Sequence, residues 1–337
     1  MPIYPLKFNP IFIEKIWGGR RLANQLGKNL PLPESRTFGE SWELSDLPGH
    51  ESTIANGPHA GRTLFEIITE FGSDFLGDIQ LTPDNRFPLL IKFLDAHAPL
   101  SVQVHPSSQY VNDHPDSARI KNEAWYIIDA DENAVIYRGI RPGISPEAFA
   151  QHVKDGPAVI DDLVTFRATP NRCFYIPSGT VHAIGPGILL AEIQTTSDDT
   201  FRLHDWGRID RPLHIKQALQ CATIGPCDTR EIERRSHVAG AFTTISRLCD
   251  CEDFRIEKVR MSEGYGQEIP YNRAAVWIVL KGEGVITNTP AKVDVEFSRG
   301  EVLLLPAGMD IARVDFEKDS SWLEIQPAIP FESTRLA

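Results

Sequence analysis

Proline and glycine recur so often in this 337-residue chain that most of its apolar runs are only five to eight residues long. The 25 prolines and 24 glycines bound segments rich in β-branched and aromatic residues, among them 99–105 (PLSVQVH), 172–179 (RCFYIPSG) and 300–308 (GEVLLLPAG). Short runs of this kind between turn residues are typical of strands in an all-β sandwich or barrel. The sequence therefore predicts a mainly β fold.

Three segments carry helical signals instead. Residues 61–77 have apolar side chains at helical spacing, and residues 211–223 are a further candidate. Residues 145–156 open with serine, then a proline in the first turn and a glutamate, which is a typical helix start. We therefore expect a small helical portion beside the β structure.

A weak internal repeat indicates how the strands are divided. Residues 172–185 and 300–314 both read as a strand followed by Pro-x-Gly, and the third residue after the glycine is His182 in the first copy and Ile311 in the second. This pattern is typical of a jelly-roll barrel of the cupin kind. We expect two cupin-like barrels: a catalytic domain over residues 1–235 with small helical insertions, and a degenerate one without metal ligands over 236–337. The polar stretch 225–245 contains the expected boundary.

Charge and cysteine content exclude several classes of protein. The net charge of −12 argues against nucleic-acid or anionic-membrane partners. Residues 1–17 contain three prolines and several charges, unlike a signal peptide or a membrane span. The five cysteines match no disulfide framework, and Cys249 and Cys251 lack a second thiol pair for a zinc site. These features predict a reduced, cytoplasmic protein.

Four polar residues in apolar strand-like segments have the chemistry of a metal site. Gln103 and His105 are two apart, so on a strand they face the same side, roughly 6.6–7 Å from each other. Glu123 heads an apolar run on the same face as Trp125, and His182 follows a Pro-x-Gly turn. Each residue alone is compatible with an ordinary surface or core position. Together, two imidazoles, a carboxylate and an amide suit Zn²⁺, Fe²⁺ or Mn²⁺.

A family resemblance rests on six motifs in fixed order, between about residues 10 and 210. They are IWGG, FGESWELSD, PLSVQVHP, KNEAWY, IPSGTVHAIG and LLAEIQTTSDDTFRLHDWGR. In these motifs the chain resembles the zinc-dependent mannose-6-phosphate isomerases, a cupin-fold family, in their short bacterial form. The resemblance implies one Zn²⁺ ion held by Gln103, His105, Glu123 and His182.

The same resemblance assigns roles to further residues. Ile184 occupies the place of a family tyrosine that is absent in some members, so the resemblance leaves the sugar contacts at this position open. The implied catalytic residues are Lys121, Glu192, Asp198 and Arg202, and the implied substrate-binding residues are Trp17, Lys92 and Ser101.

The expected reaction interconverts D-mannose 6-phosphate and D-fructose 6-phosphate by moving a proton between C1 and C2 through a cis-enediol. A divalent metal can stabilise the charge that develops on the two oxygens. The base is open among Glu192, Asp198, Lys121 and Lys92. The guanidinium of Arg202 suits an oxyanion or a phosphate, and Lys92, Lys121 and Arg208 could add positive charge around a sugar phosphate.

The sequence leaves two alternative functions open. Two histidines and a glutamate also form the ligand set of non-haem iron oxygenases, although a fourth ligand and clustered lysine and arginine argue against that class. The second alternative is a non-catalytic, sugar-binding protein of the cupin fold, since fold alone does not decide function. The sequence does not distinguish a monomer from a dimer.

Overall fold

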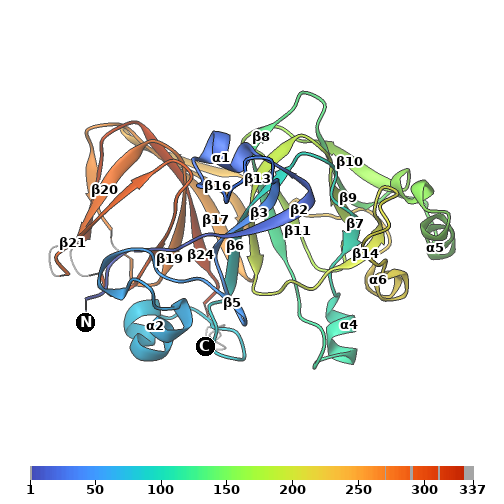
Figure 1. Ribbon diagram of the computed structural model, residues 1–337, viewed down its shortest axis with the longest axis horizontal. Helices are drawn as coiled ribbons and strands as arrows, with labels where there is room; N and C mark the ends of the chain where they lie inside the picture. Colours follow the sequence, from blue (N-terminus) through green and yellow to red (C-terminus); the bar gives the residue numbers. More distant parts are fainter. Residues whose placement is uncertain (1, 270, 289–290, 310–311, 330–337) are drawn as a thin grey trace, which may run out of the picture.

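Two β barrels lie side by side along the long axis of the molecule (Figure 1). The computed structural model describes residues 2–269, 271–288, 291–309 and 312–329, and Ile311 lies outside these ranges. Most of the regular structure is β, so the prediction of a mainly β fold of two cupin-like barrels is confirmed.

The first barrel consists of two antiparallel sheets that enclose an apolar cluster. Trp125, Ile136 and Phe174 belong to that cluster and are fully buried. The six-stranded sheet has the order β11-β8-β13-β6-β3-β2, and the five-stranded sheet has the order β10-β9-β12-β7-β14. The strands of the first sheet are β2 (Ile11–Gly19), β3 (Phe38–Leu44), β6 (Leu89–Ala96), β8 (Glu123–Ala130), β11 (Cys173–Ile176) and β13 (Ile188–Thr195). Those of the second are β7 (Val102–Val104), β9 (Val135–Ile140), β10 (Leu163–Arg167), β12 (His182–Ile184) and β14 (Phe201–His204).

The core of the second barrel contains closely packed aromatic rings. Trp322 lies between Trp277 and Phe316, with ring centroids 4.6 and 5.2 Å away. Its sheets have the orders β1-β22-β19-β24-β17-β16-β15 and β18-β23-β20-β21. The strands of the larger sheet are β1 (Leu6–Lys7), β15 (Ser236–Ala239), β16 (Thr243–Asp250), β17 (Phe254–Met261), β19 (Ala275–Lys281), β22 (Val302–Leu305) and β24 (Ser320–Pro327). Those of the smaller are β18 (Gly266–Glu268), β20 (Glu283–Asn288), β21 (Val293–Ser298) and β23 (Ala312–Phe316).

The N-terminal segment crosses between the two halves. In β1, Leu6 pairs with Leu304 of β22, so the chain contributes a strand to the second barrel before it enters the first. The short strands β4 (Asp46–Leu47) and β5 (His50–Glu51) form a separate ribbon.

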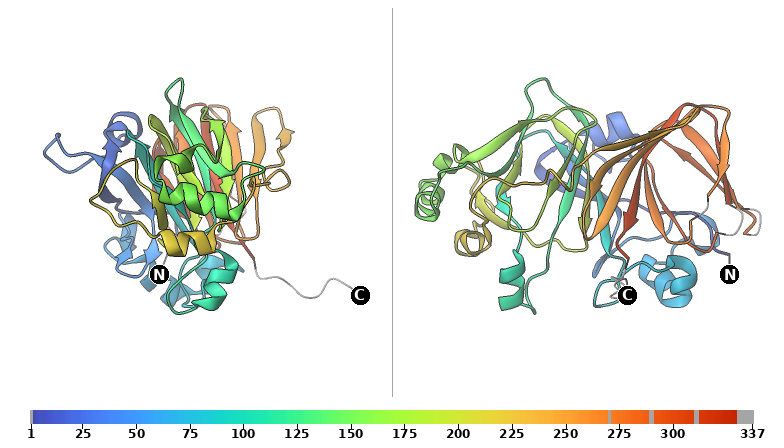
Figure 2. Two further views of the ribbon diagram at one scale, coloured as in Figure 1. Left: turned by 90° about the vertical axis from the view of Figure 1, so that its right-hand side faces the viewer. Right: turned by 180° about the vertical axis from the view of Figure 1, so that it is seen from behind.

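The outer face of β8 and β11 packs against the second barrel, as the view from behind shows (Figure 2). The ring of Tyr175 meets that of Phe254 edge to face, with centroids 6.3 Å apart. Tyr126 and Cys173 belong to the same buried cluster as Ile256 of β17. One apolar core therefore continues from one barrel into the other.

The helices lie outside the barrels, and the three predicted helical segments are confirmed. Thr63 and Glu66 form a capping box at the start of the first, and Gly72 divides that segment into two helices. The helices are α1 (Arg21–Leu26), α2 (Leu64–Phe71), α3 (Ser73–Leu76), α4 (Ser108–Asp113), α5 (Pro146–Lys154) and α6 (Ile215–Cys221), with 3₁₀ turns η1 (Gly57–His59) and η2 (Pro157–Ile160). Among the described residues, no helix has the length and apolar character needed to cross a membrane.

Candidate metal centre and active site

Three buried residues of the first barrel bring their ligand atoms together. The donor atoms of His105, Glu123 and His182 all lie within 4.8 Å of one another. Nε2 of His105 is 3.2 Å from one carboxylate oxygen of Glu123, and Nε2 of His182 is 3.4 Å from the other. No other group of three such residues occurs in the described parts of the chain.

Strand pairing explains why these residues meet. His182 opens β12 and pairs directly with Gln103 of β7, while His105 follows the last residue of β7. Glu123 opens β8 in the facing sheet. The amide nitrogen of Gln103 lies 3.2 Å from Nε2 of His182, so the fourth predicted ligand borders the same group.

Backbone carbonyls orient both imidazoles. Nδ1 of His105 lies 2.8 Å from the carbonyl of Asp199, and Nδ1 of His182 lies 2.8 Å from the carbonyl of Thr180. A carbonyl only accepts, so Nδ1 carries the proton and the lone pair of Nε2 points toward Glu123. Burial lowers the pKa of both histidines, that of His182 to about 3, which keeps the rings neutral.

The unpaired atoms of this group fit a cation. Nε2 of His105 and both carboxylate oxygens of Glu123 are buried without a hydrogen-bond partner. Lys121 is the nearest cation, with Nζ 3.0 Å from Glu123. Buried polar atoms normally have partners, and a divalent metal would satisfy all three. The donor set therefore matches a metal centre of neutral imidazoles and a carboxylate.

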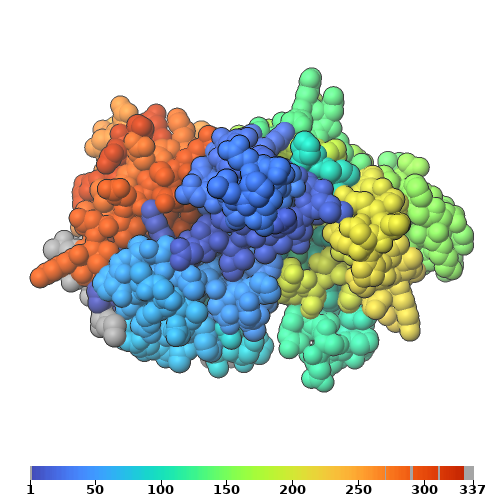
Figure 3. All heavy atoms as spheres, in the orientation of Figure 1, coloured from blue at the N-terminus to red at the C-terminus, as the bar shows by residue number. Residues whose placement is uncertain are grey.

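A cavity of about 240 Å³ adjoins this centre. Residues of β2 and of the segment after β14 both line it, and these segments border the same face of the first barrel in blue and yellow (Figure 3). The structure places every predicted catalytic and substrate-binding residue on its wall, together with one predicted ligand: Trp17, Lys92, Ser101, Gln103, Lys121, Glu192, Asp198 and Arg202.

Comparison with known proteins agrees with this arrangement. Residues 6–133 match the family profile described as phosphomannose isomerase type I, catalytic domain. Mannose-6-phosphate isomerase ManA of Bacillus subtilis is 35% identical over 317 residues, which cover 92% of this chain and 95% of that protein. The chain belongs to this isomerase family.

Further relatives support the family assignment. Mannose-6-phosphate isomerase of Streptococcus mutans is 40% identical over 313 residues, covering 88% of this chain and 92% of the relative. The crystal structure of mannose 6-phosphate isomerase from Bacillus subtilis has a TM-score of 0.84 at 30% identity, covering 96% of this chain and 99% of that one. The resemblance read from the six sequence motifs is confirmed.

In this family member, Lys92 lies among three carboxylates. Its Nζ is 3.5 Å from Glu192, 3.5 Å from Asp198 and 3.9 Å from Glu40. Burial alone would lower the pKa of Lys92, but Glu192, Glu40 and Asp198 outweigh it and raise the pKa above its usual value. Lys92 therefore remains an ammonium, which suits charge stabilisation and not proton abstraction.

Glu192 differs from Lys92, because its surroundings disfavour its charged form. Its side chain is nearly buried, and one oxygen accepts a hydrogen bond of 3.1 Å from the indole of Trp125. Burial, and then the neighbouring charge of Glu123, raise the pKa of Glu192. A carboxyl with a raised pKa can exchange a proton near neutral pH.

Arg202 of β14 lines the cavity. Arg202 pairs with Gln103 across β14 and β7, and it donates to the carbonyl of Pro212 at 2.7 Å. Its Nε is buried without a partner. Arg208 was a further candidate for binding phosphate, but it is held by Asp205 and does not line the cavity.

Four polar residues of the wall were not predicted from the sequence. Lys15 and Glu40 form an ion pair of 2.9 Å, and Arg211 is fixed by two oxygens of Asp205. Thr200 is the fourth. Glu40 lies within the FGESWELSD motif and Thr200 within LLAEIQTTSDDTFRLHDWGR, so each had a signal in the sequence; Lys15 and Arg211 had none.

The IWGG motif places Trp17 at the cavity through an irregular strand. The pairing of β2 with β3 shifts register between Glu14 and Gly19, both of which oppose Phe38. The ring of Trp17 lies on Gly39, where a Cβ would come within 2.6 Å of it. Glycine at position 39 therefore makes the space that the tryptophan fills.

Proposed function

We propose that this chain interconverts D-mannose 6-phosphate and D-fructose 6-phosphate with the help of a divalent metal, zinc being the best match. The observation that carries the proposal is the buried His105–Glu123–His182 group beside a cavity lined by acidic and basic side chains. Membership of the mannose-6-phosphate isomerase family supports it. A metal-assisted aldose–ketose isomerisation needs both a metal centre and an adjoining cavity that holds the sugar phosphate.

Gln103, His105, Glu123 and His182 would hold the ion. Two neutral imidazoles and a carboxylate are a common zinc donor set, and the amide of Gln103 adds a fourth donor. When bound, the metal supplies Lewis-acid stabilisation to the oxygens on C1 and C2 of the open-chain sugar.

Glu192 is the proposed base. We assign to its carboxylate the removal of the proton from C2 of the aldose and its delivery to C1 of the cis-enediol, while the hydroxyl proton moves from the C2 oxygen to the C1 oxygen. The raised pKa of Glu192 suits both directions of the reaction, since one group must accept and then donate the same proton. Lys92, held charged by its three carboxylates, would stabilise the ionised form of Glu192.

Arg202 and Arg211 are the proposed contacts to the phosphate. Both line the cavity, and a guanidinium can donate two parallel hydrogen bonds to a phosphate. Lys15 and Lys121 add positive charge on the same wall. Local charge would thus hold an anionic sugar in a chain whose net charge is −12.

We also propose the division into a catalytic domain over residues 1–235 and a non-catalytic one over 236–337. Every residue assigned to the site falls in the first part. All five cysteines are free, which is consistent with location of the protein in the reducing cytoplasm.

A coupled assay of mannose 6-phosphate isomerisation tests the function. Protein stripped by a chelator should lose activity and recover it with Zn²⁺ or a similar divalent ion. Absence of chelator-sensitive isomerisation in fully metallated protein would contradict the proposal. Consumption of dioxygen with iron would indicate an oxygenase, and sugar binding without turnover would indicate a binding protein.

A further inference from the structure

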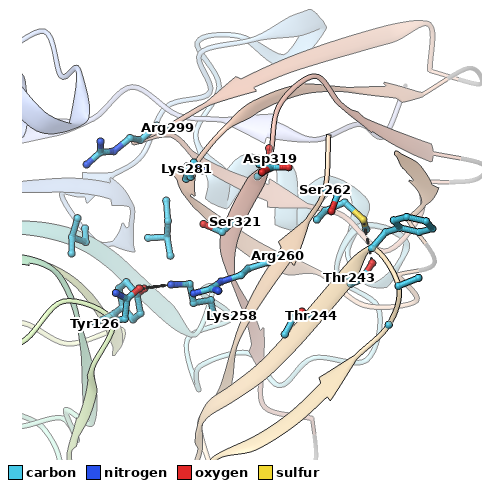
Figure 4. Close-up of a pocket in the computed structure, with 18 residues that line it drawn as sticks. Tyr126, Thr243, Thr244, Lys258, Arg260, Ser262, Lys281, Arg299, Asp319 and Ser321 are labelled. Atoms are coloured by element: carbon cyan, nitrogen blue, oxygen red, sulfur yellow. Dashed lines mark hydrogen bonds between the residues drawn. The ribbon is translucent and has the colours of Figure 1, made fainter. Parts of the chain in front are cut away.

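A second cavity, of about 590 Å³, opens where the two barrels meet (Figure 4). Tyr126 and Asn171 of the first barrel line one side of it, and strands of the seven-stranded sheet line the other. None of its lining residues also lines the candidate active site. The volume falls within the roughly 300–1,000 Å³ that small-molecule sites occupy.

Strand register arranges polar side chains in a row on the wall of the second barrel. Arg260 of β17 pairs with Thr244 of β16 on one side and with Ser321 of β24 on the other. Ser321 in turn pairs with Lys281 of β19. Neighbouring strands are about 4.8 Å apart, and all four residues line the cavity. The row therefore offers alternating hydroxyl and cationic donors along one surface.

Four cations surround the cavity without ion-pair partners. In the part of the chain that the structure describes, no carboxylate lies within 4.0 Å of the charged nitrogens of the four basic side chains, and Asp319 is the one acidic lining residue. Lys258 and Arg260 lie together next to Tyr126, and Lys281 and Arg299 lie on the other side of Ser321 (Figure 4). The four basic residues are Lys258, Arg260, Lys281 and Arg299.

Lys258 is the buried member of the group. It is only 9% exposed, and it donates a 2.8 Å hydrogen bond to the hydroxyl of Tyr126 and another to the side-chain oxygen of Asn171. Burial, and then the charges of Arg260 and Arg235, lower its pKa to about 8. A buried ammonium without a carboxylate is costly, and a bound anion would offset that cost.

A purely structural role explains Lys258 but not its neighbours. Its two hydrogen bonds join the barrels, which is sufficient reason for a lysine at this position. Arg260, Lys281 and Arg299 are exposed and make no comparable contact between the barrels among the described residues, yet all three line the same cavity.

We propose that this cavity is an accessory site for a small anion that carries two phosphoryl groups. Two pairs of cations on either side of Ser321 match two such groups, and the hydroxyls of Thr244 and Ser321 supply neutral donors between them. A guanidinium and an ammonium in each pair provide bidentate and point-charge contacts to phosphate oxygens. The site is independent of the isomerase proposal.

Calorimetric titration of the metal-loaded, full-length protein tests this site, with fructose 1,6-bisphosphate and inorganic phosphate as probes. We expect a class of sites that binds the bisphosphate at least about tenfold more tightly than phosphate. In the double variant Arg260→Gln/Lys281→Gln, the affinity of that class should fall at least about tenfold. The matched variant Lys154→Gln/Lys292→Gln removes the same charge at exposed positions outside the cavity and should leave the affinity unchanged.

Isomerase assays separate this site from the active site. Without bisphosphate, kcat and KM for mannose 6-phosphate should be the same in both double variants and the wild type, because none of the four residues lines the catalytic cavity. Equal bisphosphate affinity in the wild type and the Arg260→Gln/Lys281→Gln variant would overturn the proposal. Equal affinities for phosphate and for the bisphosphate would also overturn it. So would complete displacement of the bisphosphate by mannose 6-phosphate, because the probe would then occupy the active site.

Discussion

Replacing Glu192 by glutamine changes its charge while nearly preserving its shape and its hydrogen bond from Trp125. We expect Glu192→Gln to lower kcat by about 10²- to 10⁴-fold, since an amide cannot carry the proton between C1 and C2. KM and metal content should change little. Steady-state kinetics and metal analysis measure these quantities, with the exposed Glu296→Gln as control. A fall in kcat of less than tenfold would assign the proton transfer to another group.

Glu40 is expected to contribute stability that acid removes. Burial alone would raise its pKa, but Lys92, Lys15 and the indole of Trp42 outweigh burial and lower the pKa to about 2. Because the folded pKa lies below the unfolded value near 4.5, the contribution is complete above that pH and is lost as the pH falls toward 2. The lowered pKa corresponds to at most about 3–4 kcal/mol.

Denaturant unfolding of Glu40→Gln and wild-type protein at pH 7 and pH 3 measures this effect. The difference in unfolding free energy between the two proteins should be larger at pH 7 and smaller at pH 3. Acid releases metal from both proteins alike, so its effect cancels in the difference between their unfolding free energies at the same pH. A difference that grows on acidification would contradict the assignment.

At the scale of elements, the irregular pairing of β2 with β3 depends on Gly18. A Cβ at this position would lie 2.4 Å from the backbone of Phe38 and Gly39, which no side-chain rotation can relieve. We expect Gly18→Ala to lower the free energy of unfolding by about 1–3 kcal/mol and to raise KM as Trp17 moves. Gly240→Ala is the control, because its Cβ would make only an ordinary contact of 3.7 Å. Equal stability of the two variants would contradict this role.

Local patterns, taken together with the family resemblance, were sufficient to name the residues of the candidate metal centre. Gln103 lies on one strand and His105 directly after it, Glu123 heads another strand, and His182 follows a turn, so the local position of each was visible in the sequence although no single residue was diagnostic. The helices behave similarly: α5 begins with a capping serine and a proline at the predicted place.

Contacts between segments that are distant in the sequence could not be predicted from local patterns. Glu40 reaches Lys92 because β3 pairs with β6, and Arg211 enters the cavity because Asp205 holds it. Helices α1 and α4 have six residues each, too few to show a clear helical period, and such short helices are stabilised chiefly by tertiary packing. The pairing of β1 with β22 joins residues about 300 positions apart, which no local pattern indicates.

For the whole molecule, the continuous core between the barrels predicts that they unfold together. Phe254 of the second barrel is 1% exposed and packs against Tyr175 of the first. Phe254→Ala should therefore lower the unfolding free energy of both barrels equally, by about 3–5 kcal/mol. Hydrogen exchange measures this, since peptides from β8 and from β24 should show the same decrease in protection.

The exposed Val238→Ala, in β15 of the second barrel, is the matched control and should leave protection in both barrels unchanged. If Phe254→Ala instead weakened β24 and left β8 protected, the barrels would be separate cooperative units, and the interface would be a contact between independently stable domains. Equal loss in both would mean that the second barrel, although it contributes no residue to the proposed metal centre, supports the sheet from which Glu123 projects. Metal affinity should then fall together with protection in β8, because the ligands are held in place only while that sheet is folded.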